Sequence, residues 1–371
     1  MTVLRRVLIT GGAGFLGANF TRYWLARHAG DRVVVFDALT YAGNRTSLDA
    51  IDADPNFRFV QGDLREAEAV ATIMGEERID LVVHFAAETH VDRSIDDPDA
   101  FVTTNVVGTH NLLRAARALW RDRPAGDIAP RFHHVSTDEV YGALGPDAPA
   151  FTEATAYAPN SPYAASKAAA DHLVRAYHRT YGLPTTISTC SNCFGPYQYP
   201  EKLIPLVILH LLGGRPLPIY GDGGQVRDWL HAADHCRGVE LAIERGVPGE
   251  TYNLGGANER RNLETVGMLC DLVDAAFARD PELAGRFPAA PAAKGKESAS
   301  LMTFVPDRPG HDRRYAVDAA RARRELGFEP GVAFSAGLRA TLDWYLANEP
   351  WWKAIMDDER YRNWIAAQYA R

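Results

Sequence analysis

Residues 6–17 read Arg6-Val7-Leu8-Ile9-Thr10-Gly11-Gly12-Ala13-Gly14-Phe15-Leu16-Gly17, an aliphatic run that leads directly into glycines. A short strand that ends in glycines and opens a helical pattern is typical of turns where backbone amides approach a pyrophosphate. The glycine spacing is G-x-x-G-x-x-G rather than the common G-x-G-x-x-G. The stretch therefore predicts a strand, a dinucleotide-binding turn and a helix at the start of the chain.

Short β-branched runs alternate with helical patterns through the first half of the chain. We expect strands at 6–10, 32–36, 57–60, 81–85, 131–135 and 185–189, and helices at about 15–28, 65–76, 99–120 and 161–181. Continuous apolarity suits strands buried on both faces, and alternation with helices favours a parallel sheet. The fold class that follows is α/β, a doubly wound parallel sheet of the Rossmann type with a smaller C-terminal lobe.

The second half mixes short strands with helices and shows no internal repeat or flexible linker. Helices are expected at about 201–212, 232–245, 263–278, 334–348 and 351–370, and a strand at 251–254. The Ala-, Pro- and Lys-rich stretch 280–300 reads as an exposed excursion. We assign residues 1–190, with return segments at about 228–254 and 312–330, to the cofactor domain, and 191–371 mainly to an interleaved substrate-binding lobe.

Composition narrows the class of protein. The chain has 371 residues, 46% of them hydrophobic and 23% charged, with a net charge of -7. This balance gives no general attraction to nucleic acid or anionic membranes. The N-terminus lacks a secretory signal, and the longest aliphatic run, 203–212, is too short to span a bilayer. We therefore expect a cytoplasmic protein.

Four cysteines fit reduced thiols. Cys190 and Cys193 form a C-x-x-C, but no second pair or nearby histidine set in the sequence completes a zinc site. We expect unligated thiols and no metal.

A carboxylate ends the second expected strand. Asp37 lies about twenty residues after Gly17, where it can accept hydrogen bonds from ribose hydroxyls and disfavours a 2′-phosphate. The sequence thus favours NAD over NADP; the alternative is a tight turn followed by a surface aspartate. Asp63 and Leu64 could reach the adenine, and Ala86 and Ala87 are small enough for backbone to pass near the cofactor.

Two polar stretches carry the expected chemistry. The strand ending at Val135 is followed by a hydroxyl and two adjacent carboxylates, Ser136-Thr137-Asp138-Glu139, at the edge where open α/β sheets bind ligands. On helix 161–181, Tyr163 and Lys167 lie one turn apart on the same face. A cation there favours the ionised phenol, so we expect Tyr163 to take a proton near neutral pH. Together these residues predict an elimination coupled to redox, with one carboxylate as acid and the other as base.

These motifs resemble the extended short-chain dehydrogenase/reductase superfamily of nucleotide-sugar enzymes. Within it, the chain is similar over essentially its whole length to the dTDP-glucose 4,6-dehydratase family, through residues 136–142, 197–205, 226–229 and 307–315. The adjacent Asp138-Glu139 is the most discriminating feature, since related epimerases carry small or hydroxyl residues there.

The resemblance implies a homodimeric hydro-lyase that uses bound NAD⁺ to convert dTDP-glucose to dTDP-4-keto-6-deoxyglucose. Tyr163 would take the 4-hydroxyl proton as hydride leaves C4, with Thr137 near that oxygen. Glu139 would remove the C5 proton while Asp138 protonates the departing 6-hydroxyl; hydride would then return to C6 and C5 would be reprotonated. The dimer would form through helices 99–120 and 161–181.

Residue matching within the family extends the site. The implied catalytic residues are Thr137, Asp138, Glu139, Tyr163 and Lys167. Those for the cofactor are Gly11, Gly14, Phe15, Leu16, Gly17, Asp37, Leu39, Thr40, Asp63, Leu64, Ala86, Ala87, Tyr163, Lys167 and Cys193. Those for the sugar nucleotide are Thr89, Thr137, Asn192, Lys202, Leu203, Pro218, Tyr220, Arg227, Asn262, Arg308 and His311. In one departure, the family usually has Asn-Asn-Tyr where this chain has Asn192-Cys193-Phe194; a thiol is a weaker hydrogen-bond partner for the nicotinamide amide.

Other functions stay open on the sequence alone. A nucleotide-sugar 4-epimerase or decarboxylase would need Tyr163 and Lys167 but not the carboxylate pair. A dehydratase acting on UDP-glucose differs only by one methyl on the base, worth about 1 to 3 kcal/mol in a pocket. A silent NAD-binding scaffold is the alternative from another class. Arg227, after a glycine turn, reads as a solvated charge or a phosphate ligand, and 307–314 as a solvated loop or an anion clamp.

Overall fold

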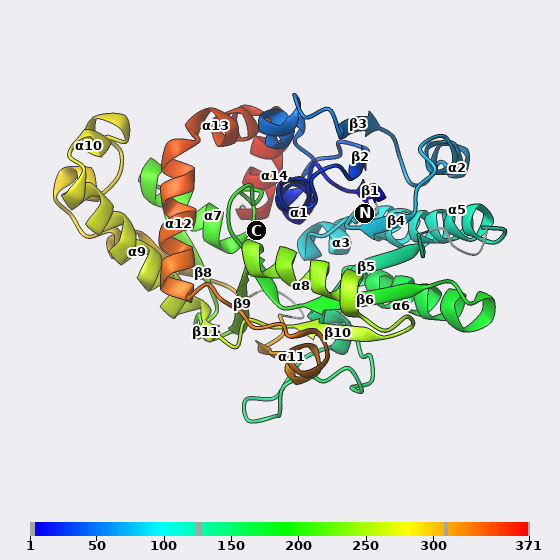
Figure 1. The fold of residues 1–371 in the computed structure, drawn as a ribbon. Coiled ribbons are helices and arrows are strands. Elements are labelled where there is room, and N and C mark those ends of the chain that lie inside the picture. Colours follow the sequence, from blue (N-terminus) through cyan, green and yellow to red (C-terminus); the bar gives the residue numbers. More distant parts are fainter. Residues whose placement is uncertain (1–3, 124–127, 308–310, 370–371) are drawn as a thin grey trace.

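Seven parallel strands form the central sheet in the computed structural model, which describes residues 4–123, 128–307 and 311–369. Their order is β10-β6-β5-β4-β1-β2-β3 (Figure 1). The strands are β1 (Arg6–Thr10), β2 (Arg32–Asp37), β3 (Phe57–Gln61), β4 (Leu81–His84), β5 (Arg131–Thr137), β6 (Thr185–Cys190) and β10 (Thr251–Leu254). Every neighbouring pair runs parallel. The expected doubly wound parallel sheet is confirmed.

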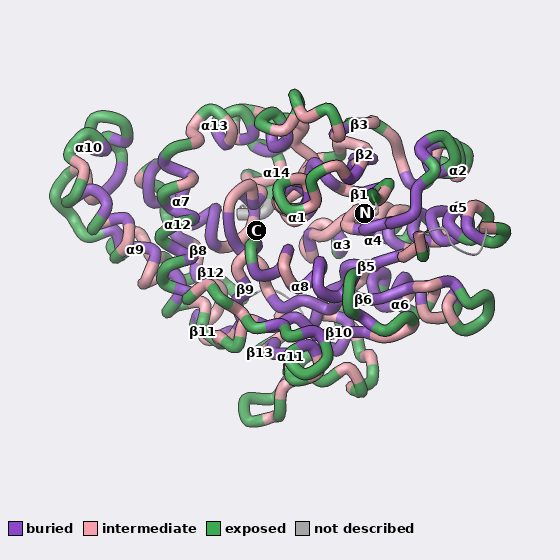
Figure 2. Tube along the Cα trace, viewed as in Figure 1, coloured by how far each residue is buried: buried purple, intermediate pink, exposed green. Residues whose placement is uncertain are grey.

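The two faces of this sheet pack into separate hydrophobic cores. Val7 and Ile9 of β1 enter one core, and Leu8 between them enters the other, as the two-residue period of a strand requires. The first core is closed by α1 (Phe15–Arg27) and α8 (Ala232–Arg245). The second is closed by α2 (Ala67–Glu76), α5 (Thr109–Trp120) and α6 (Pro162–Tyr181). Figure 2 shows the strands buried between these layers.

Local sequence signals set the start and end of α6, the helix that carries Tyr163 and Lys167. The Ser161 hydroxyl accepts a hydrogen bond from the backbone N–H of Ala164 at 3.1 Å, and Pro162 occupies the first turn. Gly182, with φ of 69°, ends the helix in the left-handed conformation. The tyrosine and lysine are therefore held on a capped, rigid element.

The helix expected at 99–120 is confirmed, because residues 98–120 are helical throughout, but the sequence did not predict that part of it is π-helical. A π-helical segment, Val102–Gly108, separates α4 (Pro98–Phe101) from α5. Within it the Asn105 amide accepts from the backbone N–H of Glu88 at 2.8 Å and donates to the Ser166 hydroxyl at 2.8 Å. These hydrogen bonds connect the π-helical segment to the loop after β4 and to α6, and they stabilise its irregular backbone.

The second lobe is built from the small sheets and helices of the C-terminal half. β7 (Asn192–Phe194), β9 (Val226–His231), β11 (Glu259–Arg261) and β13 (Arg314–Tyr315) form one sheet, and β8 (Leu217–Tyr220) pairs with β12 (Met302–Val305). Their core is shared with α7 (Leu203–Gly213), α9 (Asn262–Arg279) and α12 (Phe334–Ala347). Figure 1 places α9, α10 (Glu282–Arg286) and α12 at the left, away from β1 to β6.

One expectation for this lobe is only partly right and another is wrong. Most residues of 281–300 are exposed, as expected, but Leu283, Phe287 and Ala290 are buried in the lobe's core and Phe287 stacks on Trp352. The last expected helix, 351–370, is two helices, α13 (Glu349–Asp357) and α14 (Glu359–Tyr369). Asp358 breaks it with an extended backbone, and its carboxylate accepts from the N–H of Arg360 at 2.7 Å.

No helix in the described ranges is long and apolar enough to cross a membrane.

Candidate active site

One cavity of about 350 Å³ lies along the carboxyl ends of the central strands. The residues expected to hold the cofactor line it, from the glycine turn through Asp37, Asp63, Ala86 and Lys167 to Cys193. Leu39 is the exception; it is absent from the lining and has φ of 53°, with its N–H donating to Asp37 at 2.8 Å.

The glycine turn fits a group that needs close backbone approach. Gly11 has φ of 69°, and a Cβ there would lie 2.6 Å from the backbone of Ala86. A Cβ on Gly17 would lie 2.1 Å from the carbonyl oxygen of Gly11. Only glycine fits either position, so the start of α1 can approach a bound phosphate.

Asp37 stabilises this turn and retains capacity for a ligand. Its carboxylate accepts from the N–H groups of Ala13 at 2.9 Å and Leu39 at 2.8 Å. Burial raises the pKa of Asp37, and these two backbone hydrogen bonds oppose the rise. A carboxylate has about four acceptor positions, so it can also accept from ribose hydroxyls, while its charge disfavours a 2′-phosphate.

The carboxylate pair lies where β5 ends. Thr137 caps the short 3-10 helix Asp138–Tyr141 by accepting from the N–H of Glu139 at 3.3 Å. Asp138 is 2% exposed, and burial followed by the charge of Glu139 raises its pKa well above the ordinary value. Its Oδ2 has no hydrogen-bond partner among the residues that the structure describes. Its surroundings therefore favour the protonated form of Asp138, and one of its oxygens is available in the cavity.

The expected effect of Lys167 on Tyr163 is wrong for this structure. Burial, then the charge of Glu139, raises the pKa of Tyr163 well above its ordinary value, although a hydrogen bond with Thr137 opposes the rise. Lys167 is itself buried, which lowers its pKa to about 8, and its Nζ donates to the carbonyl oxygen of Val135 at 2.8 Å. Desolvation thus outweighs the cation, and the phenol is neutral near pH 7.

The residues expected to bind the sugar nucleotide fall into two groups. Thr89, Thr137, Asn192 and Lys202 line the cavity. The others do not line the cavity. They are Leu203 at the start of α7, Pro218 and Tyr220 on β8, Arg227 on β9, Asn262 at the start of α9, and His311, whose ring packs against Tyr220. Arg308 lies outside the described residues.

Arg227 is not a solvated surface charge. The residue is 7% exposed, its guanidinium lies 4.3 Å from the centroid of the Tyr315 ring, and it donates to the carbonyl oxygen of Asp312 at 2.9 Å. Its charge also lowers the pKa of Asp138, against the larger effect of burial. A buried guanidinium therefore lies within electrostatic reach of the carboxylate pair.

Sequence reasoning missed Glu201 as a member of the cavity wall. Glu201 is 7% exposed, burial raises its pKa, and Arg93 donates to it at 3.2 Å. The Arg93 guanidinium also lies 3.9 Å from the ring centroid of Tyr41 and 4.0 Å from that of Trp364 on α14. The available signal was its place in the stretch 197–205, which we used only to recognise the family.

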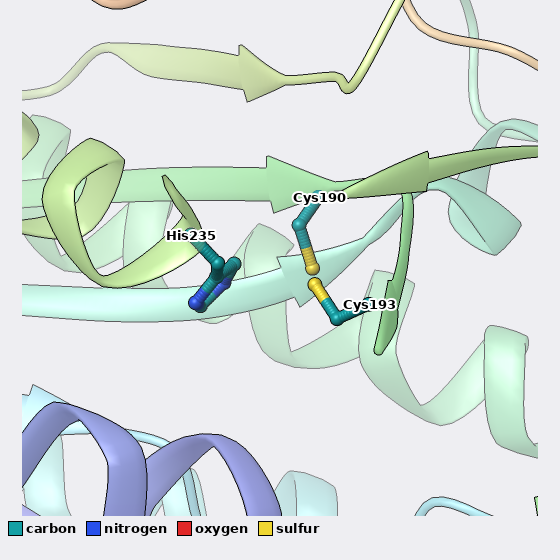
Figure 3. Close-up of side chains that lie close together, drawn as sticks. All are labelled: Cys190, Cys193 and His235. Carbon is teal, nitrogen blue, oxygen red and sulfur yellow. The ribbon is translucent and has the colours of Figure 1, made fainter. Parts of the chain in front are cut away.

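The structure also corrects the expectation that no histidine lies near the C-x-x-C. Cys190 ends β6, Cys193 lies on β7, and His235 lies in the first turn of α8 (Figure 3). The two sulfur atoms and a ring nitrogen all lie within 4.8 Å of one another. Since α8 packs against β6, a residue distant in sequence is brought to the two thiols.

The sequence model described as GDP-mannose 4,6 dehydratase matches residues 8–341 of the chain. The dTDP-glucose 4,6-dehydratase of Neisseria meningitidis serogroup B is 51% identical over 355 residues, which cover 95% of this chain and 97% of that relative. The chain belongs to the dTDP-glucose 4,6-dehydratase family. The sequence resemblance is thus confirmed.

Solved structures separate the dTDP-glucose 4,6-dehydratases from other proteins with this fold. DesIV, a dTDP-glucose 4,6-dehydratase from Streptomyces venezuelae with NAD and TYD bound, superposes with a TM-score of 0.83 at 46% identity, covering 94% of this chain and 99% of that one. The UDP-glucose 4-epimerase of Thermus thermophilus in complex with NAD has a TM-score of 0.77 but only 28% identity, over 92% of this chain and 99% of that one. The fold is shared with epimerases, whereas the sequence is that of a dehydratase.

Proposed function

We propose that this chain is an NAD-dependent hydro-lyase that converts dTDP-glucose to dTDP-4-keto-6-deoxyglucose. The observation that carries the proposal is the pair at the end of β5. Asp138 is buried with its pKa raised, and Glu139 is its neighbour in the same cavity as the glycine turn. Elimination of water needs an acid for the departing oxygen and a base for the neighbouring carbon, which oxidation or epimerisation alone does not.

The cofactor is NAD, which when bound accepts a hydride from the sugar and returns it to a different carbon. Gly11 and Gly17 leave room for its pyrophosphate, and Asp37 would accept hydrogen bonds from its ribose. Lys167 and Tyr163 line the same cavity. This placement supports the assignment of these residues to cofactor binding.

Each catalytic side chain has a proposed task. Tyr163, once ionised, accepts the proton of the 4-hydroxyl, and the Thr137 hydroxyl holds the same oxygen; the positive charges of Lys167 and of the NAD⁺ ring would favour that ionisation. The raised pKa of Tyr163 makes its phenolate a strong base once formed, since burial destabilises the charge. Glu139 removes the C5 proton, and Asp138 donates its proton to the leaving 6-hydroxyl, a task for which a carboxyl with a raised pKa is suited.

We assign sugar-nucleotide binding to the second lobe, residues 191–371, and cofactor binding to residues 1–190 with the return segments at about 228–254 and 312–330. Arg227 is the proposed phosphate ligand, because a buried guanidinium offers a planar fork of donors. His311, whose Nδ1 lies 2.7 Å from Asp307, and Tyr220, against which its ring packs, extend the binding surface.

A homodimer in the cytoplasm is the proposed working form. Val102 and Val107 in the π-helical segment are 50% and 44% exposed, and Tyr181 at the end of α6 is 49% exposed. Large apolar side chains in these two helical segments support pairing there.

Light scattering on the purified protein tests the dimer. We expect twice the chain mass for the unaltered protein and a lower mass for Val102→Glu. A monomeric unaltered protein would contradict the dimer.

The product assay separates this function from its alternatives. The protein, with NAD, is incubated with dTDP-, UDP-, CDP- and GDP-glucose, and the nucleotide sugars are analysed by mass spectrometry. A dehydratase product is lighter by one water, whereas an epimerised sugar keeps its mass. We expect water loss fastest from dTDP-glucose; unchanged masses with every substrate would overturn the proposal.

A further inference from the structure

Three potential soft-metal ligands meet beside the cofactor cavity, which we call the thiol–imidazole cluster: Cys190, Cys193 and His235 (Figure 3). Figure 3 shows the two sulfur atoms pointing toward each other, with the His235 side chain beside them. They come from β6, β7 and α8, regular elements that hold side chains more firmly than loops do.

The imidazole is the least well satisfied member of the cluster. His235 is 0% exposed, and neither ring nitrogen makes a well-formed hydrogen bond in the described part of the chain; its interaction is with the Cys190 thiol, a weak partner in the same cluster. A buried polar group without a partner costs about 1 to 3 kcal/mol. Neutral imidazole nitrogen is a preferred ligand of first-row transition metals, so a cation bound here would remove that cost.

The two thiols make only weak hydrogen bonds, so little free energy is lost when they bind a metal ion instead. The Sγ of Cys190 donates to the carbonyl oxygen of Ser136 at 3.4 Å, and that of Cys193 to the carbonyl oxygen of Ser191 at 3.5 Å. Thiols are weak donors. As thiolates, by contrast, they are the softest ligands a protein offers and select zinc and similar ions.

The distances are close to those of a tetrahedral centre. Ligand atoms around zinc lie about 3.4 to 3.8 Å apart, given Zn–S near 2.3 Å and Zn–N near 2.0 Å. The three atoms here already lie within 4.8 Å of one another. Side-chain rotations that bring them together by at most about 1.4 Å would give the separations of a zinc site.

A second cluster in the molecule shows what is specific about this one. His28, Glu240 and Glu244 also bring three ligand atoms within 4.8 Å. There, however, Arg27 donates to Glu240 at 3.0 Å, so a positive charge already occupies the carboxylate. Among the residues that the structure describes, no cation pairs with the imidazole of the thiol–imidazole cluster in this way.

We propose that the thiol–imidazole cluster binds one thiophilic divalent cation of the zinc class, with both thiols deprotonated and the fourth position open to the cavity. Both cysteines line the same cavity as Tyr163 and Lys167. A cation there shares space with the nicotinamide end of NAD⁺ and repels its positive ring. Metal and cofactor therefore weaken each other's binding by the same factor, as linkage requires.

The test measures metal directly, without substrate, so it is independent of the proposed dehydratase activity. The reduced protein is stripped with a chelator, loaded with Zn²⁺, desalted and analysed for zinc per chain, with and without saturating NAD⁺. We expect one zinc ion per chain, and we expect NAD⁺ to lower the affinity for it. X-ray absorption at the zinc edge should give two sulfur ligands at about 2.3 Å and a nitrogen at about 2.0 Å.

Matched variants localise the ion. Cys193→Ser and His235→Gln keep the side-chain size and should each weaken zinc binding about tenfold or more, as loss of a ligand does. Cys270→Ser, in the core of the second lobe, and Glu244→Gln, in the second cluster, should leave it unchanged. Bound zinc should also protect Cys193 from alkylation in the unaltered protein, which needs no variant to fold.

Three results would overturn the proposal. These are no retained zinc, zinc retained equally by Cys193→Ser, or an absorption edge without sulfur ligands. Loss of zinc binding in Glu244→Gln would place the ion at the second cluster instead.

Discussion

Two aspartates near the end of β5 are similarly buried, but their pKa values shift in opposite directions. Asp138 is 2% exposed and Asp171, on α6, is 0% exposed. Burial would raise the pKa of both. The pKa of Asp138 does rise well above its ordinary value, whereas that of Asp171 falls, because His134, Lys167 and Tyr157 act on it.

The difference lies in the partners. The Asp171 carboxylate accepts from the hydroxyls of Ser136 at 2.8 Å and Tyr157 at 2.7 Å, and lies 3.2 Å from Nε2 of His134. Asp138 faces the cavity and the negative charge of Glu139. Hydrogen-bond donors rather than depth decide which buried acid is charged. One aspartate is thereby suited to donate a proton, and the other to support the helix that carries Tyr163 and Lys167.

The largest expected effect comes from removing the proton donor. Asp138→Asn keeps the shape but cannot donate an acidic proton, so turnover of dTDP-glucose should fall about 10²- to 10⁴-fold. C4 oxidation should persist, so single-turnover absorbance should show NADH accumulating. Glu139→Gln removes the proposed base instead of the acid, so it should also slow water loss more than C4 oxidation. A fall of less than tenfold in Asp138→Asn would remove Asp138 from the acid's role.

Removing the charged aspartate should affect stability instead. Asp171→Asn leaves buried donors on Ser136 and Tyr157 poorly paired, and we expect the free energy of unfolding to fall by about 3 kcal/mol. Urea unfolding followed by circular dichroism measures it. In the same assay Asp138→Asn should not destabilise the fold. If both variants lost the same free energy of unfolding, the proposed difference between the two aspartates would be contradicted.

The two carboxyls should also give opposite pH dependences of stability. The pKa of Asp138 is raised, so its contribution is full below the unfolded pKa, about 4, and is lost as pH rises above it. The pKa of Asp171 is lowered, so its contribution is present above about 4 and is lost as pH falls below it. The free energy of unfolding of each variant is measured relative to the unaltered protein on both sides of about pH 4. For Asp138→Asn this difference should change above about pH 4, and for Asp171→Asn it should change below about pH 4.

The smallest effect tests a single donor to Asp171. Tyr157→Phe removes the hydroxyl that donates at 2.7 Å and should cost about 1 kcal/mol of stability. Tyr181→Phe, at the exposed end of α6, is the control for loss of a tyrosine hydroxyl. No measurable cost in Tyr157→Phe would show that the remaining donors suffice.

How far the sequence predicts this molecule depends on the range of the interactions. The parallel sheet follows from local patterns such as Gly11 to Gly17 and the strand at 131–135, since hydrophobic period and turn residues act over a few positions. The depressed pKa of Asp171 depends on His134 and Ser136, which only the packing of α6 on β5 brings near. The same holds for His235 beside Cys190, and for the raised pKa of Tyr163, where desolvation outweighs a neighbouring cation.

The edge strand β10 has a consequence for biosynthesis. It pairs with β6 in parallel, through Thr251 to Leu254, and the chain passes through β7, α7 and β9 of the second lobe before reaching it. A ribosome must therefore deliver residue 254 before the sheet can gain its last strand. Nascent chains shorter than this would expose the flank of β6, and we expect them to depend on chaperones until translation passes that point.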